Sequence, residues 1–125
     1  MTGTDVLRQA LMLLNYTDVN GDINAANNAN VTKRALPIIN QVYADLWEPH
    51  TGGENFSPLT GLRQEIPLSD YTLYNIMPYG VAMFLAQSEG DTDNQAMYAE
   101  LYNQRRPGAF ISQHNVADVL PRTYL

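Results

Sequence analysis

Apolar residues recur at helical spacing in four separate segments of the chain, and no other feature constrains the fold as much. These segments cover about residues 4–16, 31–47, 70–89 and 92–106. One helical face of the second segment carries Val31, Ala35, Ile39, Val42 and Leu46. A chain of 125 residues is long enough for one domain with a single core. The pattern predicts an all-α fold, a small bundle of about four helices with a long loop and an extended C-terminal tail.

Residues with strong capping preferences mark the ends of these helices. Thr4 and Ser69 are expected to cap the first and third helices, because a hydroxyl accepts a hydrogen bond from the free amides of the first turn. Gly90 is expected to end the third helix in a left-handed conformation, and Asp91 or Thr92 to cap the fourth.

Prolines and a glycine interrupt the helical segments. Pro37 predicts a kink or a late start in the second helix, and Pro49 is expected to end it. Pro78 lies inside the third segment in the same way. Gly80 costs about 1 kcal/mol relative to alanine within a helix, so a close contact between two helices is the expected reason for it. Residues 62–68 are expected to form a short extended piece.

The acidic balance of the chain excludes several classes of protein. A formal net charge of −6, with Lys33 as the only lysine, argues against a protein that binds nucleic acid. The lack of cysteine excludes disulfides and cysteine-based zinc sites. We expect neither a signal peptide nor a membrane span, because no basic N-terminal region and no long apolar run occurs. The expected location is a cytosol, or an assembly built there.

Residues 18–22 are similar to the opening of a calcium-binding EF-hand or dockerin loop. Such a loop needs a glycine at its sixth position and further oxygen ligands at the ninth and twelfth. This chain has Ile23, Ala26 and Ala29 at those positions, so a polar turn is favoured over a calcium site.

No set of residues in the sequence forms a recognisable active site. His50 and His114 lie far apart and have no partner at metal-binding spacing. No nucleophile-elbow motif surrounds the serines Ser57, Ser69, Ser88 and Ser112. We therefore predict that the protein is not an enzyme and holds no cofactor and no metal.

Aromatic residues fall close to the apolar stripes of the helices, where core and edge packing is expected. They are Trp47, Tyr71, Tyr74, Tyr79, Tyr98 and Tyr102. Arg105 and Arg106 are too few for a nucleic-acid patch, but they are candidates for an interface salt bridge.

The segment after Pro107 is apolar but shows no helical period, which divides the chain into a helical body, residues 1–107, and a tail, residues 108–125. The apolar residues of the tail are Phe110, Ile111, Val116, Val119, Leu120 and Tyr124. Fully extended, the tail would span on the order of 60 Å, enough to reach a neighbouring subunit. It either docks on a neighbour through these residues or folds back over its own bundle.

Taken together, these segments resemble the small head–tail connector (adaptor) proteins of tailed bacteriophages and prophages. Residues 34–47 resemble the second helix of these proteins, and residues 66–70 with 77–82 and 85–86 resemble the third. Residues 89–91, with Tyr98 and Tyr102, resemble the last helix. The resemblance covers roughly residues 4–106 and consists of packing and capping residues.

The resemblance implies a virion protein of the phage neck, assembled in the host cytoplasm. Connectors form a homo-oligomeric ring, commonly a dodecamer, that binds the portal and receives the tail-side neck or stopper protein. DNA passes through the channel of the ring, and an acidic lining would keep it from binding specifically. By this resemblance, the portal is the neighbour on which the tail docks.

Other functions stay open at this point. One is another helical neck or tail-completion protein, and another is a small helical interaction protein outside virions. A DNA-binding regulator would need a basic recognition helix, which the sequence does not offer.

Overall fold

A computed structural model describes residues 1–16, 29–51 and 55–109, with only the backbone described at 29–32 and 48–51. These residues form five helices: α1 (Gly3–Leu13), α2 (Ala29–Thr51), α3 (Asp70–Asn75), α4 (Met77–Ser88) and α5 (Thr92–Arg105). No strand occurs among them. The predicted all-α bundle is therefore confirmed.

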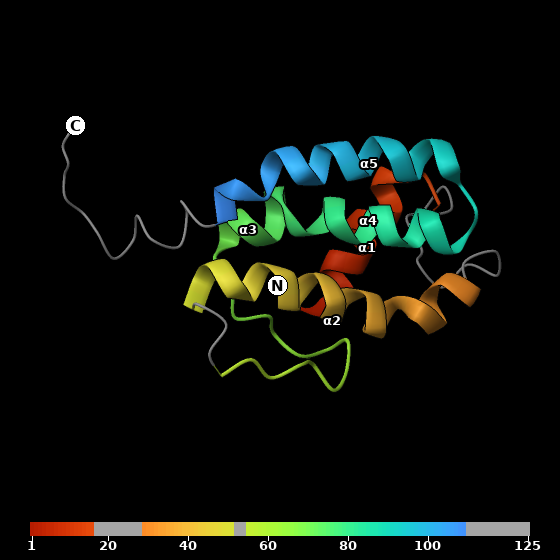
Figure 1. Cartoon of the computed structure of the whole chain (residues 1–125). Helices are drawn as coiled ribbons and strands as arrows, with labels where there is room; N and C mark the ends of the chain where they lie inside the picture. The colour runs from red at the N-terminus through yellow and green to blue at the C-terminus, as the bar shows by residue number, and fades with distance from the viewer. Residues whose placement is uncertain (17–28, 52–54, 110–125) are drawn as a thin grey trace.

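Helix α4 forms the centre of the bundle and contacts each of the other four helices. Figure 1 shows it lying between α5 and α2, with α1 crossing behind. It is apolar nearly all round, which is typical of a helix buried on every side. Its buried residues are Met77, Pro78, Gly80, Val81, Ala82, Leu85 and Ala86.

Two amphipathic helices complete the core around α4. The buried face of α1 carries Val6, Leu7, Ala10 and Leu11. The predicted face of α2 is buried at Ala35, Ile39, Val42 and Leu46. Each large side chain removed from water in this way contributes about 1.5–3 kcal/mol.

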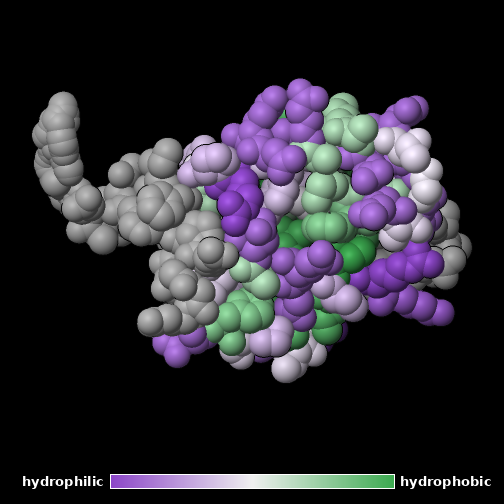
Figure 2. All heavy atoms as spheres, in the orientation of Figure 1, coloured by the Kyte–Doolittle hydropathy of each residue, from purple (hydrophilic) through white to green (hydrophobic). Residues whose placement is uncertain are grey.

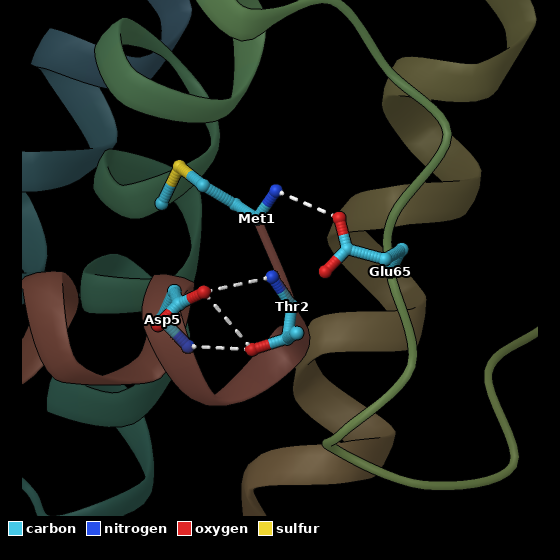
Figure 3. A network of polar contacts seen from close by, with 4 residues as sticks. All are labelled: Met1, Thr2, Asp5 and Glu65. Atoms are coloured by element: carbon cyan, nitrogen blue, oxygen red, sulfur yellow. Dashed lines mark hydrogen bonds and ion pairs between the residues drawn. The ribbon is translucent and has the colours of Figure 1, made fainter.

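The N-terminus of α1 is capped by Thr2, not by Thr4 as the sequence predicted. The Thr2 hydroxyl accepts from the Asp5 amide at 3.2 Å, and the Asp5 carboxylate accepts from the Thr2 amide at 3.0 Å. Figure 3 shows this reciprocal pair. Thr4 is not free to cap, because its amide and its hydroxyl both donate to the carbonyl oxygen of Leu62.

The expected extended piece lies along this N-terminus. Thr2 and Glu65 form an isolated antiparallel bridge, and the Ile66 amide donates to the Met1 carbonyl at 3.0 Å. The N-terminal ammonium group lies 3.2 Å from Glu65 Oε1 (Figure 3). These contacts connect the loop before α3 to the first turn of α1.

Helix α2 is longer than predicted and contains two prolines. It begins at Ala29, so Pro37 does not delay its start, and it continues to Thr51, so the predicted end at Pro49 is wrong. A proline removes one backbone hydrogen bond from a helix, but packing of an amphipathic face supplies most helical stability in a folded protein. The complete burial of Ile39 and Leu46 explains why the helix persists.

The predicted helix over residues 70–89 is in fact two helices. Ser69 caps α3 as expected, accepting from the Thr72 amide at 3.2 Å. The chain then leaves helical geometry at Ile76, with φ −125° and ψ −56°. This break places Pro78 in the first turn of α4, where a missing amide proton costs nothing.

The connection from α4 to α5 follows the sequence prediction. Gly90 has the expected positive φ of 72°, and Asp91 caps α5 by accepting from the Asn94 amide. The expected close contact at Gly80 is also confirmed. A Cβ at that position would lie 2.7 Å from the Tyr102 ring, so α5 packs directly on the backbone of α4.

Candidate interaction surface at the end of helix α5

A cluster of three polar side chains fixes the end of α5 to α2. Arg106 Nε donates to Asp45 Oδ2 at 2.7 Å, and Arg106 Nη2 donates to Asp45 Oδ1 at 3.0 Å. The same nitrogen also donates to the Asp45 carbonyl oxygen at 3.1 Å. The Tyr102 hydroxyl donates to Asp45 Oδ2 at 2.6 Å. A bidentate arginine–carboxylate pair is directional, so it sets the position of the helix end.

The protonation states of Asp45 and Tyr102 favour the hydrogen bonds of this cluster. Burial opposes the charge on Asp45, but the hydrogen bonds from Arg106 and Tyr102 outweigh that effect and hold the pKa of Asp45 below its usual value. Burial, followed by the hydrogen bond to Asp45, raises the pKa of Tyr102. Asp45 therefore stays an acceptor and Tyr102 a donor at neutral pH.

Arg105 packs on the other side of the helix end. Its guanidinium carbon lies 4.2 Å from the centroid of the Tyr79 ring, and its Nη1 donates to the Asn75 carbonyl at 3.1 Å. The two arginines that were candidates for an interface salt bridge thus both interact with their own chain. Tyr79 also contacts Tyr98, with ring centroids 6.1 Å apart.

Tyr79 forms one wall of an open groove, here called the tyrosine groove, of about 450 Å³. Its lining residues come from α1, α3 and α4 and are Gln9, Met12, Leu13, Tyr74, Pro78 and Tyr79. None of the described residues that line it is charged. Met12 is 59% exposed and Tyr74 is 53% exposed, so apolar surface is open to solvent here.

The exposure of Tyr71 and Tyr74 corrects the prediction that both pack in the core or at its edge. Each is 53% exposed. The two residues lie three apart on α3, so they share one face of that helix. Tyr98 and Tyr102 are buried as expected, and Trp47 and Tyr79 pack partly buried against the core.

A second open groove, of about 540 Å³, lies between α2 and α4. It is lined by Lys33, Arg34, Pro37, Ile38, Phe84, Gln87 and Ser88. Arg34 is bound within the chain, because its Nη1 donates to the Ser88 carbonyl at 3.1 Å and lies 3.3 Å from Glu89 Oε2. On the face drawn in Figure 2, apolar surface is visible between α2 and α5, where α4 lies beneath.

Several residues singled out in the sequence lie outside the described residues. These are the tail residues Phe110, Ile111, Val116, Val119, Leu120 and Tyr124, the loop positions Ile23 and Ala26, His114, and the side chain of His50. Gly108 and Ala109, which the sequence assigns to the tail, do pack against the body: Ala109 is fully buried. Of the serines, Ser69 caps α3, and the Ser88 hydroxyl donates to the Leu85 carbonyl.

Two further observations concern the described part of the chain. No group of three or more histidine or acidic side chains there is close enough to hold a metal ion. None of its helices combines the length and the apolar character needed to cross a membrane.

Comparisons with protein-family models, with curated proteins and with solved structures find no match for this chain.

Proposed function

We propose that the protein is a head–tail connector of a tailed phage, a structural component of the virion without catalytic activity. In this proposal, copies of the chain form a ring beneath the portal, and the tail-side neck or stopper protein binds the opposite side. The distal tail, with Val116, Val119, Leu120 and Tyr124, docks on the portal. DNA passes through the ring without specific binding.

The observation that supports this proposal most is the construction of the C-terminal end of the bundle. Arg105 and Arg106 hold the end of α5 on both sides, and Ala109 is buried, so the chain leaves a fixed point on the body. The residues that follow carry the apolar side chains of the predicted docking tail. An apolar tail that starts from a fixed point on the body is suited to a protein that joins two larger assemblies, because less of the chain has to be ordered on binding.

The residues that carry the family resemblance also have defined tasks in the fold. Ser69 and Asp91 cap α3 and α5, and Gly80 lets Tyr102 approach the backbone of α4. The net charge of −6 supports a channel that repels DNA rather than one that binds it.

The experiment is a binding assay between the purified chain and the portal protein encoded beside it, followed by size-exclusion chromatography with light scattering. We expect a complex of portal and ring. The variant Val116→Asp with Val119→Asp should abolish the complex, because two charges would have to be buried against the portal. Gln113→Asp with Asn115→Asp is the matched control, since it adds the same charge to polar positions and should bind normally.

The alternatives give different results in the same assay. Binding to the isolated neck protein without any binding to the portal would favour another neck or tail-completion protein. Tight binding to duplex DNA at physiological salt, with no binding to portal, would contradict the connector proposal.

A further inference from the structure

The geometry points to an occupant for the tyrosine groove: we propose that Phe110 and Ile111 of the same chain bind in it. This inference goes beyond the connector role and does not depend on it. It assigns the first two tail residues to the body and leaves the apolar residues from Val116 onward for a partner.

The described chain ends against α3, the helix that carries the groove residue Tyr74. An ideal Cβ on Gly108 would lie 3.4 Å from the ring of Tyr71, whose neighbour on the same face of α3 is the groove residue Tyr74. Arg105 stacks on Tyr79, which also lines the groove. In Figure 1, the end of α5 lies beside α3.

The direction of the chain at this point is fixed by packing. Ala109 is fully buried, and its amide donates to the Arg106 carbonyl at 3.0 Å. The described chain therefore ends at a fixed point beside α3. Tyr71 and Tyr74 are separated by a rise of about 4.5 Å along the helix. Two extended residues span about 7 Å, which exceeds that rise.

A short tether also favours the same chain over a second copy. A segment held this close to its site has an effective concentration in the millimolar range, which exceeds the concentration of other copies in dilute solution. The chemistry agrees as well. The described residues of the groove carry no charge, and Phe110 and Ile111 are the first large apolar residues after Pro107.

The first experiment is a double-mutant cycle on the full chain, measured by thermal unfolding. Phe110→Ala with Ile111→Ala should lower the melting temperature by on the order of 5 °C, because apolar side chains leave the groove. The same pair should have almost no effect in a chain that already carries Met12→Ala and Tyr74→Ala. Val116→Ala with Val119→Ala is the matched control in the tail and should leave the melting temperature unchanged.

Three results would overturn the proposal. One is an unchanged melting temperature for Phe110→Ala with Ile111→Ala. Another is an equal shift with and without the two groove substitutions, since the two sites would then be independent. The third is a shift that grows with protein concentration, because that would place the tail in the groove of a second copy.

A second experiment uses the fact that the chain contains no cysteine. Tyr74→Cys on the α3 wall of the groove and Phe110→Cys should form a disulfide under mild oxidation, which requires Cα atoms within about 7 Å. The product should migrate as a monomer on a non-reducing gel. Thr92→Cys with Phe110→Cys is the control, because Thr92 lies at the other end of α5, about 20 Å from Arg105. A covalent dimer, or equal oxidation of both pairs, would contradict binding within one chain.

Discussion

The substitution Gly80→Ala has two opposite effects on the stability of the protein, and their sizes can be compared. Alanine is more favourable than glycine inside a helix by about 1 kcal/mol, so helix propensity alone predicts a more stable protein. The added Cβ, however, would lie 2.7 Å from Tyr102 Cε1 and 3.0 Å from Val42 Cγ1. At least one of these neighbours would have to move.

Tyr102 is poorly placed to move. Its hydroxyl donates to Asp45 Oδ2 at 2.6 Å, and Asp45 is itself held by two hydrogen bonds from Arg106 to its carboxylate. Overpacking a core costs about 1–3 kcal/mol, and a ring fixed at its far end favours the upper half of that range. Subtracting the gain in helix propensity leaves a net loss of about 1–2 kcal/mol. For a chain of this length, the melting temperature should fall by about 4–8 °C.

Thermal unfolding followed by circular dichroism measures this shift. Gly61→Ala is the control, because no atom lies within 4 Å of its Cβ and no loss of stability is expected. In a chain that carries Tyr102→Leu, the ring is absent and Gly80→Ala should be neutral or stabilising. A higher melting temperature for Gly80→Ala in the unmodified chain would refute the close contact between α4 and α5.

Three other outcomes can be measured on the same protein. Asp45→Ala should lower the free energy of unfolding by about 1 kcal/mol, a value reduced for the partial exposure of the pair, and Asp45→Asn should cost less because it keeps an acceptor; urea unfolding measures both. The melting temperature should fall below about pH 4, because Asp5, Asp45 and Asp91 have pKa values lower in the folded chain than their usual 3.8. Their contribution is complete above that value and is lost as the pH falls through the folded pKa values, so a flat profile down to about pH 2 would contradict it. Calcium and a chelator should give the same melting temperature, because residues 18–29 lack the acid that completes a calcium site.

The helices and most of their ends could be predicted because local chemistry determines them. Ser69, Gly90 and Asp91 act through hydrogen bonds or backbone angles within a few residues. Ser69 and Gly90 have the predicted roles, and Asp91 is one of the two predicted caps of α5. Thr4 was assigned wrongly because its amide donates to Leu62, a partner far away in the sequence. Two threonines two positions apart both fit a cap, and only tertiary contact distinguishes them.

The effect of the prolines also depends on tertiary contacts. Pro78 was predicted inside one helix, but the chain breaks at Ile76 and places it in the first turn of α4. Pro37 and Pro49 do not end α2, because burial of its apolar face outweighs the loss of single hydrogen bonds. Whether burial outweighs the lost hydrogen bonds depends on tertiary packing, and the local sequence around a proline does not determine that packing.

The tyrosine groove could not be assembled from the sequence, although it left a signal. Met12 lies off the apolar stripe of α1, and Tyr71 and Tyr74 share a face of α3 opposite its buried residues Thr72 and Leu73. Single exposed apolar residues are common on protein surfaces, whereas a contiguous group of them marks an interaction site. What brings Met12 beside Tyr74 is the crossing of α1 behind α4, and this crossing is a property of the fold alone (Figure 1).

A fixed starting point for the tail has an energetic consequence for any docking partner. Ordering a backbone residue costs about 1–2 kcal/mol, so residues already held by the body do not add to the cost of binding. The contacts of Arg105 with Tyr79 and of Arg106 with Asp45 remove that cost up to Ala109. Binding of Phe110 and Ile111 in the tyrosine groove would remove this entropy cost for two further residues. The distal tail then leaves the body at one fixed position and in one direction, which favours a single register on the surface of its partner.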